Sequence, residues 1–154
     1  MPSLAHMIRP LLLTTLTVAL AAALPAAYDS VLPKARASLK IEVADVPSSE
    51  GHVLVALYDD EKVWTKPEGA AATAKVAARA GTVTVDFPNL APGVYGIALL
   101  HDADDSGDMT TNFLGIPKEA YGFGNDARGT MSAPDFGEST VRVAGETVTR
   151  VRVK

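Results

Sequence analysis

Short apolar segments with a two-residue period constrain the fold of this chain more than any other feature. Three segments alternate apolar and polar side chains, the pattern of a β-strand with one buried face: residues 38–43, 82–87 and 147–153. Two more are continuous apolar runs of strand length, as found in central strands: residues 53–58 and 94–100. The pattern therefore predicts an all-β domain.

Clusters of Pro, Ser, Asn and Gly separate these segments and favour reversals of the chain. With residues 70–80 and 140–143 added as strands, the prediction is an antiparallel seven-stranded β-sandwich of immunoglobulin-like or transthyretin-like type. One long irregular loop, at about residues 101–138, interrupts it. Two pairs of neighbouring strands are expected to form hairpins: residues 38–43 with 53–58, and residues 140–143 with 147–153.

The first 37 residues are predicted to be an export signal with a short pre-domain segment, followed by the domain at residues 38–154. Arg9 precedes a mainly apolar run, residues 11–24, which is shorter than the roughly 20 residues of a membrane span and has the form of a secretory signal. Small-x-small cleavage sites end at Ala23 and Ala37. We therefore expect an exported bacterial protein, periplasmic or secreted, with no stable membrane span after signal cleavage.

Charge and cysteine content narrow the choice of partners. Without Arg9, Lys34, Arg36 and Asp29, the chain keeps 11 basic and 17 acidic residues, a net charge of −6. This acidic balance argues against nucleic acid as a partner. Cysteine is absent, so disulfides and thiolate metal sites are excluded. An unknown protein or a glycan is the expected partner.

The long loop begins with an acidic stretch that resembles the first half of a calcium-binding loop. Oxygen-bearing side chains alternate along it, and Gly107 occupies the sixth position, where a sharp turn is needed. Phe113 occupies the twelfth position, where an EF-hand has a bidentate Glu, so the stretch is not an EF-hand. The candidate metal ligands are Asp102, Asp104, Ser106, Asp108 and Asn112, and calcium is the candidate cofactor. The alternative is a solvated turn in which Asp and Ser bond their own backbone.

Other candidate site residues lie further along the same loop: His101, Glu119, Tyr121, Phe123, Asn125 and Arg128. His101 is interpreted as a structural residue that hydrogen-bonds the loop, or as a general base oriented by Asp102 or Glu119. Glu119 and Arg128 are interpreted as an ion pair or a backbone clamp.

The same loop carries the residues of a family resemblance. They are His101-Asp102, Gly107, Asn112, Gly115, Pro117, Glu119, Gly122-Phe123, Asn125 and Ala127-Arg128-Gly129, with Gly93-Val94-Tyr95 ahead of them. On these residues the chain resembles the bacterial DUF2141 family from about residue 38 to its end. The resemblance implies an exported β-sandwich domain and carries no established activity.

Three hypotheses about function follow. The first is an exported, non-enzymatic β-sandwich module whose long loop is held by a cation or presented to a partner. The second is a carbohydrate- or peptide-binding module that uses Trp64, Tyr121 and Phe123. The third is a hydrolase or isomerase that uses His101, Asp102 and Glu119, because a His beside carboxylates is able to transfer protons.

Overall fold

The computed structural model describes residues 36–154. All but the last two residues of the predicted export signal and pre-domain segment (residues 1–37) lie outside the described residues, and signal cleavage remains a prediction. Within the described part of the chain, no helix is long and apolar enough to cross a membrane.

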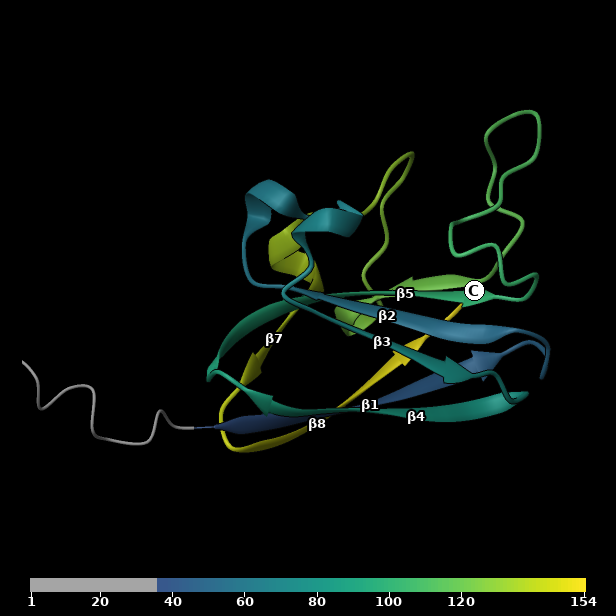
Figure 1. The fold of residues 1–154 in the computed structure, drawn as a ribbon. Coiled ribbons are helices and arrows are strands. Elements are labelled where there is room, and N and C mark those ends of the chain that lie inside the picture. Colours follow the sequence, from purple (N-terminus) through teal and green to yellow (C-terminus); the bar gives the residue numbers. More distant parts are fainter. Residues whose placement is uncertain (1–35) are drawn as a thin grey trace, which may run out of the picture. The chain divides into compact units, whose positions relative to one another are not determined.

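Within residues 36–154, eight strands form two sheets, and the fold is the predicted all-β sandwich (Figure 1). The three-stranded sheet has the order β4-β1-β8. The five-stranded sheet has the order β3-β2-β5-β6, and β7 pairs with another part of β5. The strands are β1 (Ala37–Val46), β2 (His52–Tyr58), β3 (Ala72–Ala77), β4 (Gly81–Leu90), β5 (Gly93–Asp102), β6 (Tyr121–Phe123), β7 (Thr140–Val143) and β8 (Glu146–Arg152).

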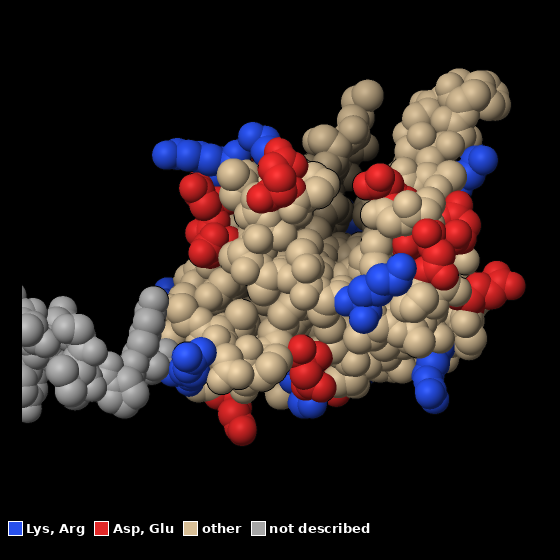
Figure 2. All heavy atoms as spheres, viewed as in Figure 1, with Lys and Arg blue, Asp and Glu red and all other residues tan. Residues whose placement is uncertain are grey.

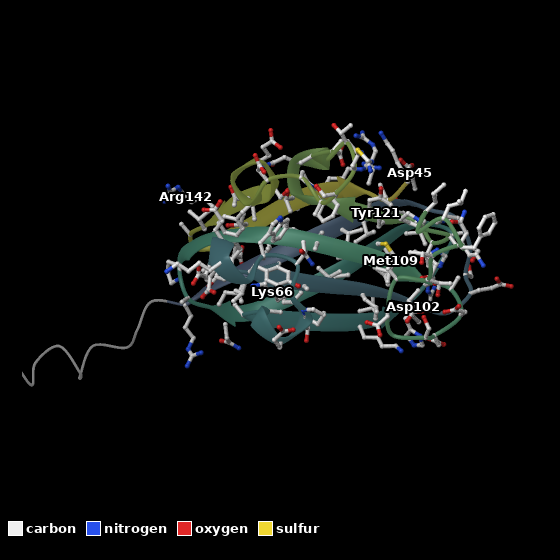
Figure 3. All side chains as sticks on the ribbon, turned by 90° about the horizontal axis from the view of Figure 1, so that it is seen from above. Asp45, Lys66, Asp102, Met109, Tyr121 and Arg142 are labelled. Atoms are coloured by element: carbon white, nitrogen blue, oxygen red, sulfur yellow. The ribbon has the colours of Figure 1, made fainter. Side chains whose placement is uncertain are left out.

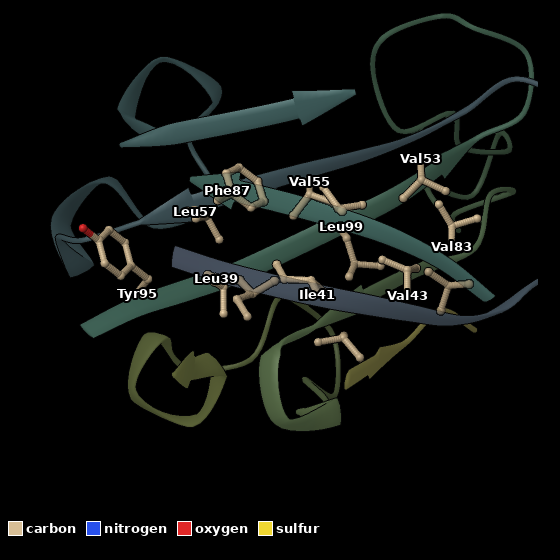
Figure 4. Packing of buried hydrophobic residues seen from close by; sticks show 14 of the residues in the cluster. Leu39, Ile41, Val43, Val53, Val55, Leu57, Val83, Phe87, Tyr95 and Leu99 are labelled. Carbon is tan, nitrogen blue, oxygen red and sulfur yellow. The ribbon is translucent and has the colours of Figure 1, made fainter. Parts of the chain in front are cut away.

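The core lies between the two sheets (Figure 4). Leu39, Ile41 and Val43 of β1 face inward, as their alternation predicts, and Val55 and Ile97 are buried in the same cluster. Because each buried aliphatic side chain contributes about 1.5–3 kcal/mol, this cluster is the main source of stability for a chain without disulfides.

Both predicted hairpins are wrong. β1 pairs with β4 and, in parallel, with β8, whereas β2 pairs with β3 and β5 in the other sheet. β7 and β8 are separated between the sheets in the same way. At the end of β1 the register shifts between Val43 and Val46, and Asp45 has a φ of 63°. Such a bulge bends a strand, and here it precedes the crossing to the second sheet.

The long loop contains one strand that the sequence did not reveal. β6 has three residues and pairs with Ala98, Leu99 and Leu100 of β5, so the sandwich has eight strands instead of seven. Residues 70–80 do contain a strand, β3, despite their alanine content. Ala72, Ala74 and Val76 pack against the core, so burial outweighs the helical preference of alanine.

Candidate functional site

The segment between β5 and β6, residues 103–120, projects from the outer side of the five-stranded sheet and is called the finger here (Figure 1). Two other segments project from the same side. One contains the 3-10 turns η2 (Glu61–Val63) and η3 (Pro67–Gly69). The other is residues 127–135, called the second loop, between η4 (Gly124–Asp126) and η5 (Phe136–Ser139).

Carboxylates hold the base of the finger by accepting hydrogen bonds from its backbone. Asp102 is fully buried, and its two oxygens accept the N–H groups of Ser106 and Gly107, both at 3.0 Å. Glu119 accepts the N–H of Ala103 at 3.0 Å and that of Thr110 at 2.9 Å. The sequence offered an ion pair with Arg128 or a backbone clamp as the role of Glu119, and these hydrogen bonds are those of a backbone clamp.

Asp102, Asp104 and Glu119 each place one oxygen within 4.8 Å of the others. Three carboxylates at this separation are able to bind a hard cation together. The neighbouring Ser106, first through its side chain and then through its backbone N–H at 3.1 Å, lowers the pKa of Asp104 from its ordinary value. Asp104 is therefore negatively charged at neutral pH, as a cation ligand must be.

Of the other predicted metal ligands, Ser106 lies beside the carboxylates, because its backbone N–H donates to both Asp102 and Asp104. Ser106 uses its hydroxyl to donate to the backbone carbonyl of Asp108 at 2.9 Å. Asn112 lies at the tip, where its side-chain oxygen accepts the N–H groups of Leu114 and Ile116. Asn112 therefore closes the turn at the tip and is separate from the group of three carboxylates.

His101 is a structural residue in this fold. Its ring is buried, and Nε2 lies 2.9 Å from the backbone carbonyl of Glu50, in the turn between β1 and β2. The sequence led us to expect the long loop as the partner of this ring, but the partner is that turn. A second histidine, His52, pairs with Asp105, which also contacts Lys75 at 3.2 Å. These bonds, with that from His52 as the larger cause, lower the pKa of Asp105.

The remaining loop residues anchor the segment after β6. Asn125 donates to the carbonyl groups of Glu138 and Thr140. Asp126 accepts the backbone N–H of Arg152 at 2.8 Å and pairs with its guanidinium. Arg128 is exposed. The ion pair between Arg128 and Glu119 that the sequence suggested is not among the ion pairs of the described residues.

Trp64 packs on the outer face of the five-stranded sheet, over Gly96 of β5. Its ring packs against Tyr58, Phe123 and Phe136 at centroid distances of 5.2 to 5.8 Å. Its indole N–H donates to the carbonyl of Pro134 in the second loop at 2.8 Å. Trp64 therefore belongs to a packed aromatic cluster on the outer side of β2, β5 and β6, and none of these four rings is part of the core cluster between the sheets.

A cleft of about 1000 Å³ lies over the outer side of the five-stranded sheet, between the three projecting segments. Figure 2 shows the finger and the second loop standing apart with uncharged tips. In Figure 3, Met109 of the finger is directed over the sheet beside Tyr121, and both side chains line the cleft. The residues of the cleft floor are Leu54, Ala56, Thr73, Lys75, Ala98, Leu100, Tyr121 and Phe123.

The outer faces of the two sheets differ in chemistry. On the three-stranded sheet, Lys40 stands beside Asp86, and Glu42 stands beside Arg150. On the five-stranded sheet, the corresponding outward positions are apolar across the central pair, with Leu54 opposite Leu100 and Ala56 opposite Ala98. An antiparallel sheet with one solvated face normally alternates apolar and polar residues. The apolar outer face of β2 and β5 is therefore a feature that packing of the core does not explain.

The comparison with known proteins supports the resemblance drawn from the loop motif. The family model described as an uncharacterized protein conserved in bacteria, DUF2141, matches residues 41–151. The chain belongs to the DUF2141 family. No curated protein and no solved structure is similar enough to this chain to count as a match.

Gly122 of the DUF2141 motif and the nearby Gly124 have a packing role in this domain. A Cβ on Gly122 would lie 2.3 Å from the carbonyl oxygen of Arg152, and one on Gly124 would lie 2.1 Å from that of Ser139. The motif thus brings the chain after the finger into close contact with β8 and η5. Sequence reasoning did not single out Asp126 or the outward-facing residues of β2 and β5. The outward-facing residues of β2 and β5 could have been found from the continuous apolar runs of these strands, because such runs leave no polar outer face.

Proposed function

We propose that this DUF2141 domain is an exported, non-enzymatic binding module that takes an apolar ligand in the cleft. The apolar outer face of β2 and β5, lying at the bottom of a cleft with loop walls, carries this proposal. Its volume of about 1000 Å³ falls at the upper end of the range of about 300–1,000 Å³ typical of small-molecule sites. Lys75 and Asp108 are the charged residues of its lining, which supports a largely uncharged ligand.

The arrangement of the aromatic residues favours an apolar ligand over a glycan. Sugar-binding sites use exposed aromatic faces, but Trp64 packs against three other aromatic rings and Phe123 is buried. Catalysis by His101 has less support, because its ring is buried against Glu50 and does not line the cleft. Met109 and Met131 in the walls are flexible apolar side chains that adapt to ligands of different shape.

Titration with the apolar fluorophore 1-anilinonaphthalene-8-sulfonate tests this proposal. Leu100→Asp places a charge on the cleft floor and should weaken binding of the probe at least tenfold. Val94→Asp is the matched control, because Val94 lies on the outer side of the same strand and outside the cleft. Circular dichroism confirms that both variants are folded. Equal binding by the two variants would refute a ligand site at this cleft.

A cation site at the base of the finger is a second candidate function, favoured by the convergence of Asp102, Asp104 and Glu119. Without a twelfth-position Glu, calcium affinity should be weak, about 10⁻⁴ to 10⁻³ M, and magnesium should bind less well. Tenfold excess over the dissociation constant would add about 1.4 kcal/mol of stability. Calorimetric titration of Asp104→Asn should show no calcium heat, with Asp135→Asn as the control that keeps it. Absence of heat and of a melting shift in the unmodified protein would leave the solvated turn as the explanation.

Export rests on the leader, in which Arg9 precedes the apolar run of residues 11–24. Mass spectrometry of protein from the extracytoplasmic fraction should show a new N-terminus between Ala23 and Ala37. Recovery of the intact chain from membranes would contradict this part of the proposal.

A further inference from the structure

We infer that two copies of this domain dimerise by inserting the tip of each finger into the cleft of the other copy. The inference rests on the cleft described above, but it concerns a different occupant from the proposed ligand. Two observations carry it: an apolar tip that is closed by its own hydrogen bonds and left in solvent, and an apolar cleft beside it.

The tip of the finger exposes large apolar side chains in a fixed arrangement. Phe113 is 94% exposed, Leu114 68% and Ile116 54%. Hydrogen bonds to Asn112 and a bridge between Thr111 and Pro117 close the turn that carries them. A pre-formed turn loses little conformational entropy on binding, and a protruding aromatic residue is a frequent anchor of protein interfaces.

The finger leaves its own cleft open. Leu114 and Ile116 stand in the wall of the cleft, whereas Phe113 is outside the lining. The finger rises away from the outer face of the five-stranded sheet (Figure 1). Phe113 is therefore placed to enter a surface that faces the sheet from outside.

A two-fold symmetric dimer buries both surfaces of each copy by repeating one kind of contact twice. When two five-stranded sheets face each other across a two-fold axis, each finger points toward the opposite sheet and each cleft receives one tip. Such an interface is self-complementary and closes at two copies. Residues 112–117 carry no charge, and the lining has one Lys and one Asp. The two surfaces in contact therefore carry little charge themselves.

The apolar area is sufficient for a stable dimer. A Phe buries about 150–250 Å², so a tip with Phe, Leu and Ile buries roughly 400–500 Å², and the cleft around it buries a similar area. Two such contacts bury roughly 1,600–2,000 Å², within the range of about 1,200–2,000 Å² for specific interfaces.

Sedimentation velocity over a concentration series tests the oligomeric state. The full processed protein should show a monomer–dimer equilibrium, and Phe113→Asp should raise the dimer dissociation constant at least tenfold. Val148→Asp is the matched control, because Val148 is a 63% exposed apolar residue on β8 of the other sheet. Val148→Asp should dimerise like the unmodified protein. A monomer at millimolar concentration, or equal effects of the two substitutions, would overturn the inference.

Directed cross-linking tests the geometry, and the absence of native cysteine makes it selective. A mixture of Phe113→Cys and Ala56→Cys proteins should form a disulfide between copies on mild oxidation, because Ala56 lies on the cleft floor. Val148→Cys mixed with Ala56→Cys should not. Phe113→Asp should still bind the fluorophore, since Phe113 does not line its own cleft. Failure of the dimer with intact fluorophore binding would thus refute this inference and leave the proposed function standing.

Discussion

Glu119 is expected to govern the stability of the finger independently of the core. Its carboxylate accepts the N–H groups of Ala103 and Thr110, which are seven residues apart on the same segment. A hydrogen bond to a charged group contributes about 1.5–3 kcal/mol, and the lower value suits Glu119, which is half-buried. Glu119→Ala removes both bonds and should destabilise the closed finger by about 3 kcal/mol.

Glu119→Gln provides an intermediate case. The amide keeps one acceptor oxygen and turns an N–H group toward the other backbone N–H, so one bond is lost. Since about 1.4 kcal/mol is a factor of ten, amide hydrogen exchange at Ala103 and Thr110 should accelerate roughly 100-fold in Glu119→Ala. In Glu119→Gln, one of the two amides should accelerate about tenfold.

Exchange is measured by NMR with a chelator present, so that no cation contributes. Glu146→Gln, an exposed carboxylate in β8, is the control and should leave both amides unchanged. The loss in the free energy of global unfolding should not exceed the free energy that holds the finger closed, because the core cluster keeps its contacts when the finger is open. Unchanged exchange at both amides in Glu119→Ala would refute the role assigned to this carboxylate.

Three further outcomes are expected. Leu99→Ala, in the core, should lower the free energy of unfolding by about 2–5 kcal/mol. Lys40→Ala, on the solvated face, should lower it by less than about 0.5 kcal/mol. Equal losses of the two variants in urea denaturation would mean that the buried and solvated faces are wrongly assigned. Gly122→Ala places a Cβ against the end of β8 and should lower the free energy of unfolding by about 1–3 kcal/mol, as measured by thermal unfolding. Gly137→Ala, whose Cβ would meet open space, should leave thermal unfolding unchanged. Burial raises the pKa of the Tyr58 hydroxyl above its ordinary value. The contribution of Tyr58 to stability is therefore complete below about pH 10 and is lost as the pH rises through the folded-state pKa. The free energy of unfolding should fall less steeply above pH 10 in Tyr58→Phe, and identical slopes in the two proteins would contradict this.

The sequence alone determined seven of the eight strands between residues 36 and 154, the buried faces of the alternating strands, and the family. Alternation along residues 38–43 identified Leu39, Ile41 and Val43 as core residues, because side chains of a strand point to opposite faces in turn. The motif in the long loop identified the DUF2141 family, which the family model confirms. Local patterns were sufficient for these conclusions because each depends only on residues that are close together in the chain.

Only the tertiary structure decided which strands pair and what the long loop builds. A turn such as residues 47–51 has the same composition whether it closes a hairpin or crosses between sheets, so the pairing of β1 with β4 and β8 could not be read from it. Glu119 joins Asp102 and Asp104 only because the finger returns to its own base. The cleft combines side chains from β2, β5, the finger and the second loop. Contacts between residues so distant in sequence depend on how the whole chain closes around the core, and a local period carries no information about that closure.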